Sequence, residues 1–336
     1  MRVTAALIIL LISSLVYAQK PQNSKTDVPL RGISAVSGNV AWASGAKGTV
    51  LRTIDRGTTW ETLVIAGADS LDFRDIQAFD QNTAFVLSIG PGDQSRIYKT
   101  SDGGKIWQRQ FTNSDPKAFY DCFAFWDSIH GIALSDSVDG KFPLIATSDG
   151  MTWNPVAVKN MPAALASEGA FAASGTCVAT FGKNDAWFGT GGPAARVFHS
   201  ADRGKNWTVA ETPIIHGAAS QGVFSLAFWT AKDGVAVGGD YKEPKKGENV
   251  AAVTHDGGKT WTLATKPPAG YRSAVAVEPS HTLMAVGTSG ADISHDGSKT
   301  WTPMFTEDLN ALALIGNSGW AVGPGGKIVA LHVDSH

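Results

Sequence analysis

Residues 254–261 read Thr254-His-Asp256-Gly-Gly258-Lys-Thr260-Trp261, and close variants of this octapeptide occur at five other places along the 336-residue chain. In each copy a Ser or Thr stands two residues before an Asp, and a Trp follows four or five residues after it. Short hydroxyl and carboxylate side chains bond backbone amides two or three residues on, and Gly adopts conformations that other residues resist. The motif therefore predicts a structural β-turn, with the Trp opening the next strand. Its repeated residues are Asp55, Asp102, Asp149, Asp202, Asp256 and Asp296, with Trp60, Trp107, Trp153, Trp207, Trp261 and Trp301.

The spacing of these aspartates, 40 to 54 residues, is typical of one four-stranded propeller blade. Strand-like alternation precedes each turn, as in residues 74–79, 40–43 and 49–52. A seventh unit, residues 309–331, lacks the Asp turn and a fourth strand. We therefore expect an all-β, seven-bladed propeller over residues 28–336, with Asp turns between the third and fourth strands of six blades. The segment near Lys20–Val28 would supply the missing outer strand and protect the open edges.

The N-terminus has the composition of a secretory signal peptide. Arg2 is followed by an apolar run over residues 3–16, and small residues precede Gln19. The run is too short for a comfortable membrane span, so we expect residues 1–18 to be removed and no membrane span to remain. Residues 19–27 are polar and form a linker that is in position to close the last blade. The mature protein is expected in the periplasm or outside the cell.

Composition excludes several classes of function. Lys and Arg number 28 and Asp and Glu 30, for a formal net charge of −2, and no basic block is present, which argues against a nucleic-acid partner. The eight histidines are dispersed, so we expect no metal site, and no motif indicates a cofactor. The two cysteines, Cys122 and Cys177, fall on the inner strands of neighbouring blades. They form either two buried apolar thiols or a disulfide.

The turns resemble the Asp boxes of bacterial neuraminidase-repeat proteins. The combined unit, seen in residues 73–76, 319–323 and 254–261, resembles the photosystem II stability/assembly factor family of seven-bladed propellers and its non-photosynthetic relatives. The resemblance covers roughly residues 28–333 of the chain. It implies a non-enzymatic scaffold, taken here as a monomer, that binds a protein or pigment-protein partner through an arginine patch. The residues that we assign to this partial patch are Arg31, Arg74 and Arg272, at one repeat phase of blades 1, 2 and 6, with His216 beside them.

Four further side chains lie in loops that break the period, on the face opposite the Asp turns. These residues are Asp136, Glu168, Asp240 and Tyr241. They are solvated loop residues, a binding site for a charged partner, or catalytic groups of a sialidase-like or other glycoside hydrolase acting on an extracellular glycan. The chain lacks the Arg-Ile-Pro start of sialidases and has seven units rather than six. We favour the non-enzymatic scaffold, and the sequence leaves enzymatic activity open.

Overall fold

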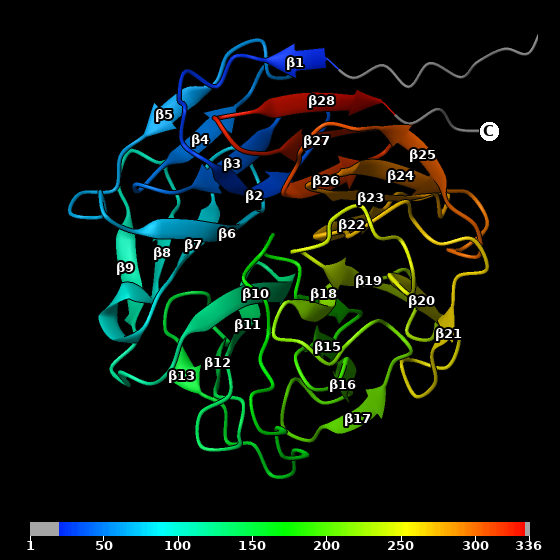
Figure 1. Ribbon diagram of the computed structural model, residues 1–336. Helices are drawn as coiled ribbons and strands as arrows, with labels where there is room; N and C mark the ends of the chain where they lie inside the picture. Colours follow the sequence, from blue (N-terminus) through cyan, green and yellow to red (C-terminus); the bar gives the residue numbers. More distant parts are fainter. Residues whose placement is uncertain (1–19, 333–336) are drawn as a thin grey trace, which may run out of the picture.

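The computed structural model describes residues 20–332, which form seven four-stranded antiparallel sheets arranged around a central axis (Figure 1). The protein is a seven-bladed β-propeller, as the repeat predicts. The proposed leader, residues 1–18, lies outside the described residues. From the hub outwards, blade 1 contains β2 (Leu30–Ala35), β3 (Ala41–Gly45), β4 (Val50–Thr53) and β5 (Glu61–Leu63), and blade 2 contains β6 (Asp72–Ala78), β7 (Ala84–Ile89), β8 (Arg96–Thr100) and β9 (Gln108–Thr112).

The other blades repeat this order from the hub to the rim. Blade 3 contains β10 (Tyr120–Asp127), β11 (His130–Ser135), β12 (Leu144–Thr147) and β13 (Asn154–Pro155); blade 4 contains β14 (Val178–Phe181), β15 (Asp185–Gly189), β16 (Arg196–Ser200) and β17 (Thr208–Glu211). Blade 5 contains β18 (Gln221–Phe228), β19 (Gly234–Asp240), β20 (Ala251–Thr254) and β21 (Thr262–Leu263); blade 6 contains β22 (Ala274–Val277), β23 (Leu283–Gly287), β24 (Gly290–Ser294) and β25 (Thr302–Phe305). Blade 7 contains β26 (Ala311–Ile315), β27 (Ser318–Val322), β28 (Ile328–His332) and β1 (Lys20–Gln22).

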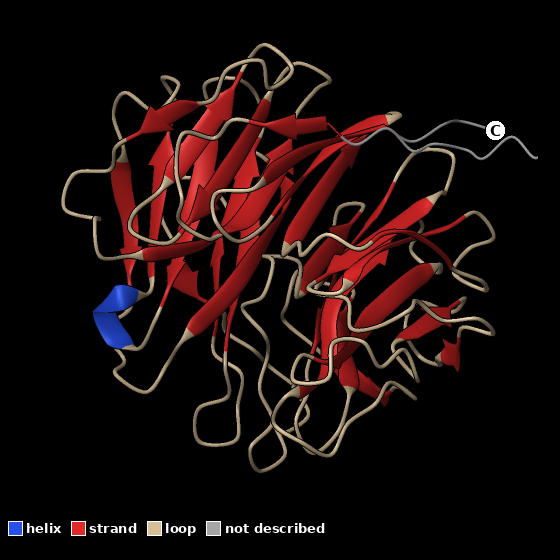
Figure 2. Cartoon of the chain, turned by 45° about the horizontal axis from the view of Figure 1, so that its top comes forward, coloured by secondary structure: helices blue, strands red, loops and turns tan. Residues whose placement is uncertain are grey.

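Strands make up nearly all the regular structure (Figure 2). In the described part of the chain, the one helical element is the 3₁₀ turn η1 (Gly92–Gln94) at the rim of blade 2. Residues 20–332 contain no helix with the length and hydrophobicity needed to cross a membrane.

The N-terminal segment closes the ring. β1 pairs antiparallel with β28, so the first and last described strands lie side by side at the outer edge of blade 7 (Figure 1). The Gln22 Oε1 atom accepts hydrogen bonds from the indole of Trp60 in blade 1 at 2.9 Å and from that of Trp320 in blade 7 at 3.2 Å. Its amide nitrogen donates to the Arg56 carbonyl at 2.9 Å. One side chain therefore links the two blades where the ring is sealed.

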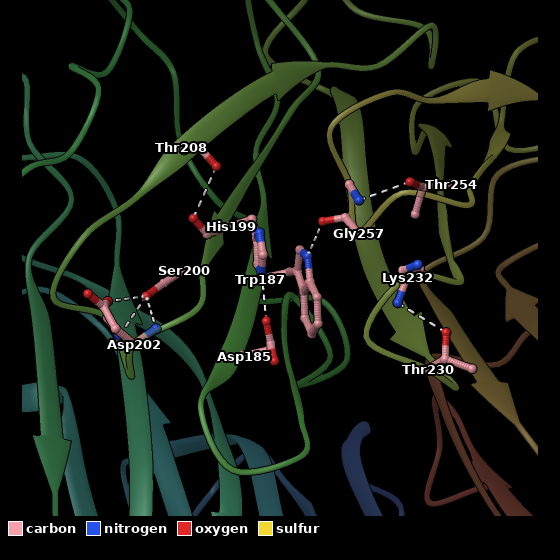
Figure 3. A network of polar contacts seen from close by, with 12 residues as sticks. Asp185, Trp187, His199, Ser200, Asp202, Thr208, Thr230, Lys232, Thr254 and Gly257 are labelled. Carbon is pink, nitrogen blue, oxygen red and sulfur yellow. Dashed lines mark hydrogen bonds and ion pairs between the residues drawn. The ribbon is translucent and has the colours of Figure 1, made fainter.

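The Asp turn of blade 4 shows how the repeated motif works (Figure 3). The Ser200 hydroxyl donates to Asp202 Oδ1 at 2.9 Å and accepts from the Gly204 N–H at 2.8 Å. Asp202 Oδ1 also accepts from the Asn206 N–H at 2.8 Å. Gly204 has φ = +85°, a conformation that favours glycine. The Trp207 indole donates to the Gly204 carbonyl at 2.8 Å. The hydrogen bonds from Ser200 and Asn206 occupy the Asp202 carboxylate within its own turn.

Aromatic and aliphatic side chains fill the seams between blades. Trp187 of β15 is buried between two rings, stacking on His199 at 4.7 Å and on Phe228 of blade 5 at 3.7 Å between centroids. Its indole donates to the Gly257 carbonyl in the blade 5 turn at 2.9 Å (Figure 3). Trp126 makes the same kind of bond to Asp185 of the next blade at 2.8 Å. Trp187 and Trp126 therefore join neighbouring blades.

The Asp turns all lie on one face of the ring, beside the hairpins that join first and second strands. In blade 2 the Gly103 N–H donates to the Asn82 carbonyl at 2.9 Å, and in blade 5 the Gly257 N–H donates to Lys232 at 2.9 Å. The innermost strands begin on the opposite face. That face carries the irregular loops and the site described next.

Candidate functional site

Four innermost strands carry a β-bulge at an equivalent place near their start. The pairing registers skip one residue each in blades 1, 2, 3 and 5, and the skipped residues are Arg31, Arg74, Asp121 and Phe224. A bulge redirects the side chain of the extra residue. These four side chains, with Tyr271 of blade 6, surround the axis of the ring, and we call this cluster the hub mouth.

Arg31 is half-buried, and its guanidinium makes no hydrogen bond or ion pair with another described residue. Burial lowers the pKa of its guanidinium, and the positive charge of Arg74 lowers it further. Tyr271, and after it Asp72 and Asp308, oppose this lowering of the Arg31 pKa. Arg31 is therefore a partly desolvated cation at the hub mouth without a direct partner, an arrangement that favours an incoming anion.

Arg74 is held in place by its own neighbours. Its Nε donates to Asp72 Oδ2 at 2.9 Å, and its Nη1 donates to the Ala172 carbonyl at 3.0 Å. About a quarter of the side chain, 26%, remains exposed. Asp121 lies close enough for its pKa to respond to Arg74, although burial raises that pKa well above the ordinary value. Arg74 therefore contributes both structure and positive potential.

The assignment of Arg272 to the same phase as Arg31 and Arg74 is wrong by one residue. The Leu30 N–H donates to the Gly323 carbonyl of the preceding blade at 3.0 Å, and the Arg272 N–H donates to Gly238 of its preceding blade at 2.9 Å. Arg272 thus occupies the position of Leu30, and Ser273 that of Arg31. A one-residue shift turns a strand side chain to the other face.

The consequence for Arg272 is burial inside blade 6. Its side chain is 1% exposed and forms an ion pair with Asp292, which is equally buried. The guanidinium also donates to the Tyr271 carbonyl at 2.7 Å and to the Ser289 hydroxyl at 3.0 Å. It is therefore inaccessible to a partner in this structure, and the arginine patch reduces to Arg31 and Arg74.

The segment that joins blades 3 and 4 enters the centre of the ring (Figure 1). We call residues 169–176 the hub plug. The Ala172 carbonyl accepts from Arg74 of blade 2, the Ser174 hydroxyl donates to the Ser273 carbonyl of blade 6 at 2.7 Å, and the Thr176 and Ser225 hydroxyls lie 2.7 Å apart. The plug thus ties blades 2, 5 and 6 across the axis.

An aromatic cluster covers the plug. Phe171 stacks on Phe224 with ring centroids 3.7 Å apart, and Tyr271 meets Phe224 edge to face at 4.8 Å. Tyr241 contacts the same Phe224 ring at 6.2 Å and is 46% exposed. The hub mouth therefore presents an aromatic surface beside the cationic Arg31.

Carboxyl groups line the blade 3 side of the hub. Asp136 Oδ1 accepts from the Ala170 N–H of the plug at 2.8 Å, and burial raises the pKa of Asp136 to about 6. Burial also raises the pKa values of Asp75 and Asp121. Asp75 Oδ2 accepts from the Phe123 N–H at 2.7 Å. These groups hold the plug and the inner strands.

Glu168, proposed above as a catalytic candidate, is a buried structural residue. Its Oε1 accepts from the Thr190 hydroxyl at 2.6 Å and from Arg196 Nε at 2.8 Å, and its Oε2 accepts from the Leu165 N–H at 2.8 Å and pairs with Arg196 Nη2. The residue is 2% exposed. Both carboxylate oxygens are occupied, so the group is not presented to a substrate.

Asp240, Tyr241 and His216 do not assemble into a catalytic set either. Asp240 Oδ2 accepts from the Gln221 amide at 3.0 Å and its Oδ1 from the Lys242 N–H at 2.9 Å. Burial opposes the negative charge, but these hydrogen bonds keep the pKa of Asp240 below its ordinary value. His216 is exposed and bonds the Ile214 carbonyl through Nδ1 at 2.8 Å. Tyr241 alone of the three joins the aromatic cluster.

Cys122 and Cys177 form a disulfide with Cα atoms 6.2 Å apart. It joins β10 of blade 3 to the start of the blade 4 inner strand, directly after the hub plug. Of the two alternatives left open by the sequence, the structure has the paired one.

Three residues at the hub mouth escaped the sequence analysis: Asp121, Phe224 and Tyr271. Asp121 and Tyr271 each stand next to a position singled out for another reason, Cys122 and Arg272, and no sequence signal marked Phe224. Bulges shift that position by one, and a sequence without its structure does not show where they occur.

Among residues 20–332, no group of three or more His, Cys, Asp or Glu side chains converges to hold a metal ion. No protein-family model matches the sequence, and no curated protein matches it.

Solved structures do resemble the fold. The structure "YCF48 bound to D1 peptide" superposes with a TM-score of 0.68 at 11% identity, covering 96% of this chain and 97% of that chain. YCF48 from Cyanidioschyzon merolae gives 0.61 at 17% identity, covering 94% and 99%. Virginiamycin B lyase from Staphylococcus aureus gives 0.67 at 12% identity, covering 95% and 100%. At these identities the likeness shows the propeller fold alone.

Proposed function

We propose that this protein is an exported, non-catalytic scaffold that binds a protein partner at the hub mouth. The observation that carries the proposal is Arg31, a half-buried guanidinium without a direct anionic partner among the described residues. Such a group gains most from a carboxylate that arrives with the partner. The YCF48 structure with a bound D1 peptide supports a protein ligand for a propeller of this shape.

The surroundings of Arg31 define the partner's chemistry. Tyr241 and Phe171 offer aromatic surface beside the charge. The hub plug fills the axis beneath them, so the site receives a segment laid across the ring. The partner is a peptide segment that carries a carboxylate next to an apolar or aromatic side chain.

Export to the periplasm or outside the cell is part of the same proposal. It rests on the signal-like composition of residues 1–18 and is supported by the Cys122–Cys177 pair, because disulfides persist in oxidising compartments. The glycoside hydrolase alternative gains no support, since Glu168 is committed to Arg196 and Asp240 to Gln221.

The test is a pull-down from an extract of the source cells with Arg31→Gln and with Arg31→Gln/Arg74→Gln. We expect partner capture to fall about tenfold or more, because loss of a desolvated charge pair costs on the order of 2 kcal/mol or more. The melting temperature of the Arg31→Gln protein should stay unchanged, since Arg31 stabilises no other group. Arg109→Gln, an exposed arginine on β9, is the matched control.

Arg272→Gln is the contrasting variant. It leaves Asp292 buried without its ionic partner, so we expect the free energy of unfolding to fall by about 3–5 kcal/mol. Undiminished capture by the Arg31→Gln/Arg74→Gln protein would reject the proposed site.

A further inference from the structure

A second site lies at the outer edge of blade 3, away from the hub. A cavity of about 790 Å³ opens between blades 2 and 3, within the roughly 300–1,000 Å³ typical of small-molecule sites. Its walls include Phe111 of β9, Val138, Phe142 before β12, and Val156 after β13. We call it the rim cavity.

The cavity lies beside the end of the fourth strand of blade 3, which, like that of blade 5, stops two residues sooner than those of blades 2 and 4. In blade 2 the Asn113 N–H continues the outer strand by donating to the Ser95 carbonyl at 3.0 Å, and in blade 4 the Thr212 N–H donates to Ala195 at 2.8 Å. In blade 3 the chain bonds Leu144 through the Val156 N–H and then leaves. The space that two more strand residues would occupy is therefore open.

The departing segment is anchored elsewhere, so it does not return to fill this space. The Lys159 N–H donates to the Lys205 carbonyl at 2.8 Å, and the Trp207 N–H donates to the Asn160 carbonyl at 2.8 Å. These bonds attach the chain to the Asp turn of blade 4. The segment that leads from blade 3 to blade 4 is thus held in place along one wall of the cavity.

One polar group inside the cavity has no partner. Tyr120 is 5% exposed, and its ring packs edge to face on Phe111 at 5.2 Å. Its hydroxyl makes no hydrogen bond within the described chain. Burial, with help from the charge of Asp115, raises the pKa of Tyr120 to about 12, so the phenol remains a donor. The Tyr120 hydroxyl is therefore available to donate a hydrogen bond to a group that enters the cavity.

Positive charge marks the polar end of the site. Lys141 and Lys159 line the cavity, are exposed, and form no ion pair with another residue between 20 and 332. The acidic lining residue, Asp115, accepts the Lys117 N–H in its own turn at 2.9 Å. The balance of charge at the rim favours an anion.

The cavity offers an extended chain little free strand edge to pair with. Lys117 and Asp139 form an ion pair at 3.1 Å that links the two loops beside it, and Pro155 and Val156 occupy the other end of the β12 edge. A peptide strand would need a free path along that edge. A small molecule does not.

We propose that the rim cavity binds a small amphiphile, with its apolar body between blades 2 and 3 and an anionic group facing Lys141 and Lys159. The Tyr120 hydroxyl donates to a polar atom of the same ligand. Nothing in this proposal depends on the hub mouth.

The test uses laurate, its cationic counterpart dodecyltrimethylammonium, and the fluorescent anion 8-anilinonaphthalene-1-sulfonate. Laurate should displace the fluorescent anion from the full-length protein, and the cation should bind more weakly. Lys141→Ala/Lys159→Ala should weaken laurate binding about three- to tenfold, as expected for rim charges. Lys245→Ala, an exposed lysine of blade 5, should have no effect.

Two further variants locate the binding. Tyr120→Phe should weaken laurate binding about fivefold, whereas Tyr98→Phe, which alters a buried tyrosine outside the cavity, should not. Val158→Trp should fill the cavity and abolish binding, with the melting temperature reporting that the protein is folded. Arg31→Gln should leave laurate binding intact, which separates this site from the hub mouth.

Three results would overturn the proposal: no saturable laurate binding, equal affinity for the cation, or unchanged affinity in the folded Val158→Trp protein. Displacement of the probe by an acidic peptide, with laurate inert, would assign the cavity to a protein partner instead and would also overturn it.

Discussion

At the residue scale, the hub mouth depends on side chains whose environments differ although their repeat positions are equivalent. Arg31 and Asp121 both occupy the bulge of an inner strand. Arg31 has no direct partner, whereas Asp121 is buried with one oxygen that makes no hydrogen bond in the described chain. The bulge position is equivalent in these blades, but the residue that occupies it differs, so its chemistry differs from blade to blade.

Asp136 makes the free energy of unfolding depend on pH. Its folded pKa, about 6, lies above the ordinary value because the group is buried. Between about pH 4 and pH 6 the Asp136 carboxyl is protonated in the folded protein but ionised in the unfolded chain. Proton binding by Asp136 therefore stabilises the folded protein at low pH, and this stabilisation is lost as the pH rises through 6.

Asp136→Asn keeps an acceptor for the Ala170 N–H and removes the buried charge. The variant should match the parent near pH 4 and exceed its free energy of unfolding by about 2–3 kcal/mol at pH 7. Urea titrations at both pH values measure the difference, with Asp69→Asn, an exposed carboxyl, as the control. A constant difference across this range would exclude the buried-charge explanation.

The sequence identifies the Asp turns residue by residue because their hydrogen bonds are local, as in Ser200 and Asp202. It misplaces Arg272 because that position depends on pairing between strands, where one skipped residue exchanges inside for outside. It also leaves Glu168 with three alternative roles and misses its buried ion pair, since its partner Arg196 is 28 residues away. Local chemistry could be predicted, but non-local pairing could not.

At the element scale, the three-residue strand β1 closes the ring. Three residues pair with β28, and Gln22 adds hydrogen bonds from two tryptophans. The repeat arithmetic predicted a missing strand in blade 7. It did not predict that a single glutamine would bond blades 1 and 7 together.

Gln22→Ala tests this link. It leaves the buried indole N–H groups of Trp60 and Trp320 without an acceptor, so the free energy of unfolding should fall by about 2–4 kcal/mol. Gln110→Ala is the matched control because Gln110 accepts from one indole, that of Trp153, at 3.2 Å. Urea denaturation should show a smaller loss for Gln110→Ala. Equal losses would mean that Gln22 has no special role in closure.

At the scale of the whole molecule, the disulfide reinforces the join between neighbouring blades 3 and 4, and the hub plug connects blades that are not neighbours. Cys122 and Cys177 enclose a sequence separation of 55 residues that includes the plug. The plug then reaches blades 2, 5 and 6. The centre of the ring is thus stabilised by contacts across the axis as well as around it.

Removing the disulfide should lower the stability of the whole ring. For a loop of this length, the loss of chain entropy in the unfolded state corresponds to about 4 kcal/mol. The Cys122→Ala/Cys177→Ala protein should unfold at lower urea concentration than the oxidised parent and be insensitive to dithiothreitol. The parent should approach it on reduction. An unchanged midpoint for the reduced parent would show that the bond does not constrain the chain.

The pairing of β1 with β28 also sets the order of assembly during translation. The strand that leaves the ribosome among the first must wait, unpaired, until the strand of residues 328–332 has been made. Six blades can form as they emerge, but a nascent chain remains an open arc with a bare edge at each side. The circle is therefore completed only after β28 has been made, and both edges stay unpaired until then.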